Sequence, residues 1–223
     1  MNRMFRVPRI WSNRELRKIA PLCTGIIVNV SGWDDRDKEG GRYREYFINA
    51  HDYYITNYVG FRGTQGLPEE IPLDLEADLP NVLFHRFDVV FNHTTLEHVF
   101  DIRKAFGNLC ALSKDAVIVV VPFAQIQHES DSYGDYWRFT PLCLEKMFQQ
   151  NGLTTVYESA SPHANAGVYL FAFATRNPDV WRERLPAPCG ASNAGSWIGR
   201  NRVAYELCRI VKNVNMRLGR TTL

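Results

Sequence analysis

One short segment of the chain gathers side chains that could together move a proton. His128, Asp135 and Arg138 stand there among tyrosine and tryptophan residues. A histidine titrates near neutral pH and can take a proton from a hydroxyl, while a carboxylate orients its ring. We therefore predict His128, Asp135 and Arg138 as the catalytic group, with Asp131 as an alternative orienting carboxylate. The structural alternative is an Asp135–Arg138 pair that stiffens a loop before a helix capped by Thr140.

A second set of polar side chains follows a buried strand. Asn92 and His93 come directly after the run 87–91, which is apolar except for Asp88 and is typical of a strand covered on both faces. Open α/β sheets bind ligands at the carboxyl ends of their strands. The apolar run 116–121 ends just before the His128 segment. We therefore expect both sets at one edge of the sheet, with structural roles for Glu97 and His98 in the next turn.

The elements that position these residues alternate between strand and helix. Apolar periodicity and turn residues predict strands at 25–30, 53–56, 71–75, 87–91, 116–121, 156–157 and 168–174, and helices at 12–20, 100–112 and 141–151. The charged stretch 36–44 stands where a crossover helix would lie, and its two glycines favour a short helix or a loop. The fold class predicted is α/β, a three-layer Rossmann-like sandwich with a mostly parallel sheet and an added C-terminal amphipathic helix.

Composition divides the chain into four parts. We expect a basic N-terminal helical extension (1–22), an α/β domain (23–185), a linker (186–196) rich in proline, glycine, alanine and serine, and a basic amphipathic helix (197–223). Residues 1–20 and 198–223 each carry six basic side chains against one acidic. The body between them is therefore acidic.

The five cysteines are widely spaced and form no Cys-x-x-Cys pair. We interpret them as reduced thiols of a cytoplasmic protein and expect no metal site. The chain has neither an apolar run long enough to span a bilayer nor the apolar core of a signal peptide at its start.

The C-terminal helix has three candidate partners. Its apolar residues recur at helical spacing, with arginine and lysine elsewhere on the wheel. It can dock on the domain, pair with a second subunit as a homo-oligomer, or make a peripheral contact with an anionic membrane. Basic and aromatic residues are not interleaved as in RNA-binding modules, so we do not expect a nucleic acid partner.

Two motifs resemble the class I S-adenosylmethionine-dependent methyltransferases. The segments Phe87-Asp-Val-Val90 and Leu96-Glu-His-Val99 are similar to the fourth strand of that family and the turn after it. Asp135-Tyr-Trp-Arg-Phe-Thr140 resembles a stretch found in a subset of these enzymes. The resemblance extends from about residue 25 to residue 174 and implies a Rossmann-like methyltransferase fold that binds S-adenosylmethionine as cofactor.

The resemblance also implies positions for the cofactor. A glycine-rich turn after the first strand would hold its methionine part, an acidic residue after the second its ribose, and an acidic residue after the third its adenine. This chain has a single glycine in the first turn and an uncharged Asn57 in the second position. The cofactor-binding residues so implied are Val30, Ser31, Gly32, Asn57, Asp74, Asn92 and His93.

The function predicted is methyl transfer to an oxygen of a small-molecule or glycan-like acceptor, with His128 as the base. The link to polysaccharide biosynthesis comes from the resemblance alone. The lone glycine and Asn57 support an alternative, a non-catalytic binding or scaffold protein that keeps the fold but has weakened cofactor binding. A third reading is a nucleotide-handling α/β enzyme that uses the same edge of the sheet.

Overall fold

The computed structural model describes residues 3–60, 63–162, 166–187 and 210. Four short 3-10 helices lie at Ala20–Leu22, Tyr43–Tyr46, Asn81–Leu83 and Leu96–His98. The longer elements are α1 (Arg3–Ile19), β1 (Gly25–Val30), β2 (Ala50–Asn57), β3 (Glu70–Pro72), β4 (Phe87–His93), α2 (Ile102–Leu112), β5 (Ser113–Ala124), α3 (Pro141–Gln150), β6 (Thr154–Ala160), β7 (Val168–Thr175) and α4 (Pro178–Arg184).

These strands form one sheet in the order β3-β2-β1-β4-β5-β7-β6. The first five are parallel, while β7 runs antiparallel to both of its neighbours. Val30 and Asn92 are register partners, so β1 and β4 end side by side. The predicted α/β fold with a mostly parallel sheet is confirmed.

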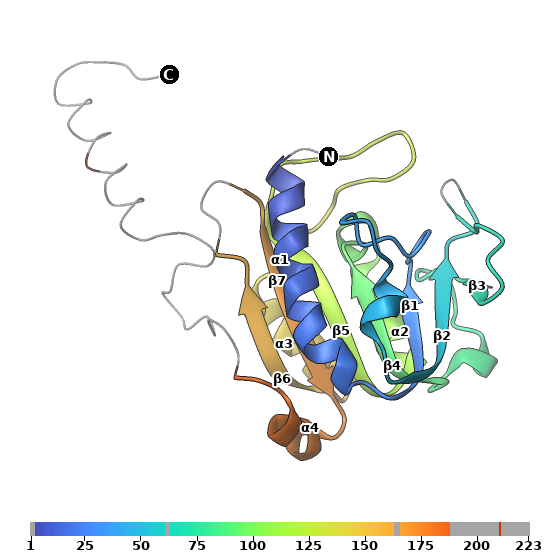
Figure 1. The fold of residues 1–223 in the computed structure, drawn as a ribbon. Coiled ribbons are helices and arrows are strands. Elements are labelled where there is room, and N and C mark those ends of the chain that lie inside the picture. Colours follow the sequence, from blue (N-terminus) through green and yellow to red (C-terminus); the bar gives the residue numbers. More distant parts are fainter. Residues whose placement is uncertain (1–2, 61–62, 163–165, 188–209, 211–223) are drawn as a thin grey trace, which may run out of the picture.

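Both faces of the sheet are covered, which gives three layers (Figure 1). In β5, Val117, Val119 and Val121 pack into the core beneath α2 and α3. Ile118 and Val120 point to the other face, which α1 and α4 cover. Successive residues of a strand face opposite sides, so an uninterrupted apolar run is what a doubly covered strand requires.

Helix α1 is longer than the predicted 12–20 segment and forms part of the outer layer. It continues through Pro8 and buries Trp11, Leu16 and Ile19 against the sheet. Glu15 is also buried, and its carboxylate accepts hydrogen bonds from the Tyr157 hydroxyl and Ser159 Oγ of β6. The predicted extension is thus packed on the α/β domain.

A loop held by two buried aspartates replaces the first crossover helix. Asp35 accepts hydrogen bonds from Asn29 Nδ2, the Tyr53 hydroxyl and the Arg44 amide. Asp37 accepts from two backbone amides and the Tyr46 hydroxyl. These carboxylates replace the hydrogen bonds that a helix would make within itself.

Several element bounds differ from the expected ones. The third strand spans Glu70–Pro72 rather than 71–75, because its partner β2 ends at Asn57, the register partner of Pro72. Helix α4 was not predicted, although Pro178 stands at its favoured first position. Two predicted segments lie outside the described residues. These are the linker from residue 188 to 196 and, except for residue 210, the C-terminal helix 197–223.

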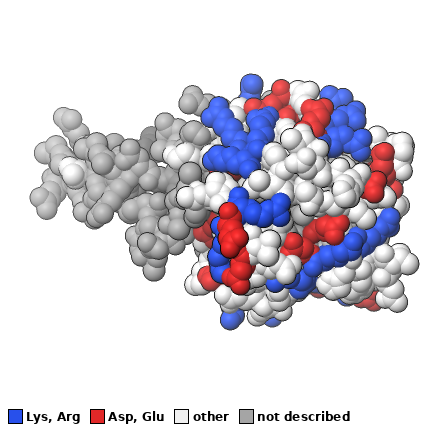
Figure 2. Space-filling model, turned by 60° about the horizontal axis from the view of Figure 1, so that its bottom comes forward, with Lys and Arg blue, Asp and Glu red and all other residues white. Residues whose placement is uncertain are grey.

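Figure 2 shows the lower face of the molecule, where groups of Lys and Arg and groups of Asp and Glu are scattered among other residues. Within the described ranges, none of the helices is both long and apolar enough to cross a membrane.

Candidate functional site

A cavity of about 540 Å³ opens at the carboxyl ends of β1 and β4. This is the edge where the sequence places the site, and the volume lies in the range of small-molecule pockets. Ser31, Gly32, His93 and His128 of the predicted residues line it. Its lining also includes Glu97, His98 and Tyr133, together with residues of α1.

His93 is tied to α1 through both ring nitrogens. The guanidinium of Arg9 can only donate, so His93 Nδ1, 3.3 Å from Arg9 Nη1, accepts. His93 Nε2 therefore carries the proton and donates to Ser12 Oγ at 2.8 Å, and that hydroxyl donates to the Arg9 carbonyl. Burial, aided by the nearby Arg9 charge, holds the pKa of His93 well below its usual value. His93 is thus a neutral residue that anchors the helix.

Arg9 is a site residue that the sequence analysis missed. It also donates to the Tyr43 hydroxyl and to Thr94 Oγ1, and it forms no salt bridge among the described residues. Arg36 and Lys38 add positive charge to the cavity lining. The sequence feature that could have identified Arg9 is its spacing from Phe5 and Ser12, which places the three residues on one face of a helix.

The turn after β1 is bound to β2 through its backbone. The amide of Ser31 donates to Thr56 Oγ1, and that of Gly32 donates to the Thr56 carbonyl. A Cβ at Gly32 would lie 2.6 Å from Asn29 Nδ2, so this glycine permits close packing of Asn29. Ser31 has a φ of 56°, a conformation that non-glycine residues rarely adopt outside functional or tightly held turns.

Asn57, which is buried, lies outside the cavity lining. Its Oδ1 accepts from the Trp33 amide, and its Nδ2 donates to the Trp33 carbonyl and to Glu70 Oε1. Asp74 accepts from the Glu76 amide in the turn after β3 and is also outside the lining. Asn57 and Asp74 are therefore hydrogen-bonded to neighbouring groups of the protein.

Val30 and Asn92 join β1 to β4 below the cavity. Asn92 Nδ2 donates to the Val30 carbonyl at 2.9 Å, and both residues are buried. Neither belongs to the cavity lining. This hydrogen bond aligns the carboxyl ends of β1 and β4, next to Ser31 and His93.

His128, Asp135 and Arg138 form a connected group. Two hydrogen bonds of 2.6 Å join Arg138 to Asp135, and they hold the pKa of that carboxyl at about 2. Asp135 Oδ2 accepts from the His128 amide and lies 3.4 Å from His128 Nδ1. These contacts therefore fit both the predicted catalytic group and the structural alternative, in which the Asp135–Arg138 pair stiffens the loop. Asp131 is exposed and is not among the cavity residues.

Glu97 and His98 stand next to this group. The Glu97 carbonyl accepts from the Tyr136 amide at 2.7 Å, which fixes the loop against the turn after β4. Burial raises the pKa of the Glu97 carboxyl to about 8. His98 Nδ1 lies 2.6 Å from the Gly134 carbonyl, and burial lowers the pKa of this ring.

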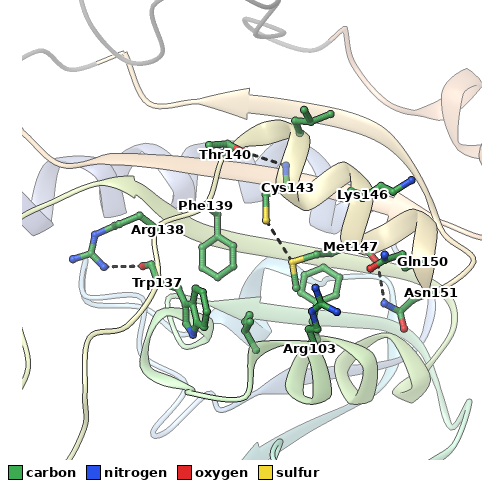
Figure 3. A pocket seen from close by; sticks show the side chains of 13 residues that line it. Arg103, Trp137, Arg138, Phe139, Thr140, Cys143, Lys146, Met147, Gln150 and Asn151 are labelled. Carbon is green, nitrogen blue, oxygen red and sulfur yellow. Dashed lines mark hydrogen bonds between the residues drawn. The ribbon is translucent and has the colours of Figure 1, made fainter.

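A second cavity, of about 770 Å³, lies between α2 and α3 (Figure 3). Phe139 and Met147 form part of its apolar wall, while Arg103 and Lys146 add positive charge. Thr140 Oγ1 accepts from the Cys143 amide, which confirms the predicted helix cap. Arg138 is the only predicted catalytic residue in its lining.

The chain has the fold of the class I S-adenosylmethionine-dependent methyltransferases. The 1,6-didemethyltoxoflavin N1-methyltransferase of Burkholderia thailandensis, solved with S-adenosylhomocysteine, superposes with a TM-score of 0.52. It is 16% identical, over 74% of this chain and 80% of that one. The magnesium protoporphyrin IX methyltransferase of Synechocystis PCC 6803, solved with bound S-adenosylmethionine, gives 0.54 at 11% identity, over 79% and 85%.

A third similar structure, from Rhodobacter sphaeroides, is described as a putative zinc-dependent alcohol dehydrogenase. Its TM-score is 0.54 at 16% identity, over 76% of this chain and 94% of that one. No family model and no curated protein matches the sequence. At such identities the likeness shows the fold, and the activity has to be argued from the site.

Proposed function

We propose that this protein transfers a methyl group from S-adenosylmethionine to an oxygen of a small or glycan-like acceptor in the cytoplasm. One observation carries the proposal: in a methyltransferase fold, the cavity at the ends of β1 and β4 is lined by Ser31, Gly32 and His128. The glycan-like acceptor and a place in polysaccharide synthesis rest on the resemblance of residues 135–140 alone.

The cavity suits the methionine end of the cofactor better than its adenosine end. The cofactor supplies an electrophilic methyl group when bound. Its amino-acid carboxylate is negatively charged, and Arg9 and Lys38 line the cavity with positive charge. At the other end, Asn57 and Asp74 are bound within the protein and outside the lining. The ribose and adenine positions that the resemblance implies therefore have weaker support from the cavity than the methionine position.

His128 is our candidate base. Methyl transfer to a hydroxyl releases a proton, and an imidazole within reach can accept it. Asp135 lies 3.4 Å from His128 Nδ1 and stabilises the charged ring, while Arg138 holds Asp135 in place. Nε2 of His128 then takes the proton from the acceptor.

Calorimetric titration with S-adenosylmethionine and S-adenosylhomocysteine tests the proposal. We expect saturable binding of both, and the absence of heat at millimolar ligand excludes the enzyme. His128→Ala should remove turnover while changing cofactor affinity less than about threefold, because the base acts on the acceptor. A large loss of affinity would instead make His128 a cofactor contact. His51→Ala, at an exposed position of β2, is the matched control.

The binding-protein alternative has its own support. The amides of Ser31, Gly32 and Trp33 all donate to β2 or to Asn57, so none of the three is left to approach a cofactor. A protein of this kind keeps the cavity and binds a small anion through Arg9. It would give no heat with either cofactor form.

A further inference from the structure

One side of the cavity brings a carboxylate and two imidazoles together. Glu97, His98 and His128 each offer a ligand atom, and these atoms all lie within 4.8 Å of one another. Glu97 Oε1 is 3.9 Å from His98 Nε2. Two ligands on one zinc ion at about 2.1 Å can be no more than about 4.2 Å apart. Small side-chain rotations would therefore place all three atoms on one centre.

The carboxylate of Glu97 needs a partner that the described protein does not supply. The side chain is fully buried, yet neither Oε1 nor Oε2 accepts a hydrogen bond from a described residue. A buried carboxyl group without a hydrogen-bond partner, in either protonation state, is costly and rare in folded proteins. Glu97 also lines the cavity, so a bound cation can reach it.

Each imidazole is oriented as metal-binding histidines usually are. Nδ1 of His98 donates to the Gly134 carbonyl, which leaves the Nε2 lone pair for a ligand. Nδ1 of His128 lies 3.4 Å from Asp135 Oδ2 and 3.1 Å from Gln125 Nε2. In the tautomer whose Nδ1 proton points to the Asp135 carboxylate, Nε2 is the atom left for coordination. An oxygen that accepts a hydrogen bond from the other ring nitrogen fixes the ring and raises the basicity of the ligating nitrogen.

We propose that Glu97, His98 and His128 form a binding site for a divalent first-row transition cation such as Zn²⁺. Two nitrogen ligands and one oxygen ligand suit such ions, whereas Mg²⁺ and Ca²⁺ prefer sites made of oxygen. Three protein ligands leave further coordination positions, which face the cavity and can take water or an acceptor oxygen. The sequence analysis expected no metal because it considered cysteine spacing only.

The site bears on the proposed function through His128. One nitrogen cannot bind a cation and accept a proton at the same time. With a cation in place, the cation lowers the pKa of a coordinated hydroxyl, and His128 is a ligand. Binding of the cation itself needs neither cofactor nor acceptor. A metal titration of the protein alone therefore succeeds or fails independently of methyl transfer.

The test is Zn²⁺ titration of the full chain without a polyhistidine tag, with metal content measured after dialysis. We expect about one equivalent bound. His128→Ala and Glu97→Gln should each weaken binding at least tenfold, since ligands contribute more than the partners that orient them. His51→Ala removes an exposed imidazole of β2 and should bind as the unmodified chain does.

Each result of the titration either supports or overturns the proposed metal site. Because any zinc held by cysteines is common to all variants, the difference between the unmodified chain and His128→Ala reports this site alone. No binding by the unmodified chain, or equal affinity in His128→Ala, overturns the proposal. Circular dichroism checks that Glu97→Gln is folded. If it is not, His128→Ala decides alone, because its side chain is partly exposed.

Discussion

At the residue scale, the site is defined by the bonding capacity that the protein leaves unused. The two nitrogens of His93 and the amide of Asn57 are engaged within the protein. The carboxylate oxygens of Glu97 are buried and have no described partner. A side chain whose donors and acceptors are all paired within the protein has none left for a ligand. A side chain with an unpaired buried atom instead favours binding of a ligand that pairs with that atom. The residues that the sequence singles out therefore overlap only in part with the residues that have bonding capacity to spare: His128 belongs to both sets, whereas His93 and Asn57 do not.

Asn57→Asp tests this distinction, because it restores the acid expected of the family. We expect it to lower the free energy of unfolding by about 2–4 kcal/mol, since a carboxylate there would face Glu70 Oε1 and the Trp33 carbonyl. Urea unfolding measures the loss. Adding Glu70→Gln supplies a donor and should recover part of the stability. Tighter cofactor binding by Asn57→Asp without loss of stability would show that the family pattern is the better guide.

At the element scale, the strands and a helical N-terminal segment could be predicted, but the contribution of that helix to the site could not. Ala116 to Val121 is an uninterrupted apolar run, and the packing of both faces explains it. The helix predicted at 12–20 begins at Arg3 instead, because α1 continues through Pro8. The position of Arg9 depends on how α1 crosses the sheet, so it is a property of tertiary packing. The Glu97, His98 and His128 cluster likewise requires the loop after β5 to fold back onto the turn after β4.

Glu15 is expected to be a second anchor of α1, in addition to His93. Its buried carboxylate accepts from Tyr157 and Ser159, and Lys18 pairs with its other oxygen. Glu15→Ala would leave the two hydroxyls without their acceptor. Hydrogen bonds to charged groups are worth about 1.5–3 kcal/mol each, so we expect a loss of about 2–4 kcal/mol in urea unfolding. Glu183→Ala, at an exposed position of α4, should change stability by less than about 0.5 kcal/mol. Equal effects of the two substitutions would contradict the anchor.

At the scale of the whole molecule, α1 makes the outer layer and the site interdependent. The helix covers β7 and supplies Phe5 and Arg9 to the cavity. Figure 1 shows its N-terminal end beside the loop that follows β5, where the Phe5 ring lies 5.0 Å from the His128 ring. Loss of the helix would therefore remove part of the core and part of the site together.

Removal of residues 1–22 should consequently abolish cooperative folding. The deletion takes Trp11, Leu16 and Ile19 out of the core, and burial of such side chains is worth about 1.5–3 kcal/mol each. Their sum approaches the total stability of a typical domain, about 5–15 kcal/mol. We expect the chain that begins at Cys23 to aggregate or to melt without a sharp transition in circular dichroism. The Arg6→Ala/Arg14→Ala double variant removes exposed charge but no core contact, and it should melt as the unmodified chain does. If the shortened chain instead melts sharply at the same midpoint, residues 1–22 are a separable extension and the α1 contacts contribute little to stability.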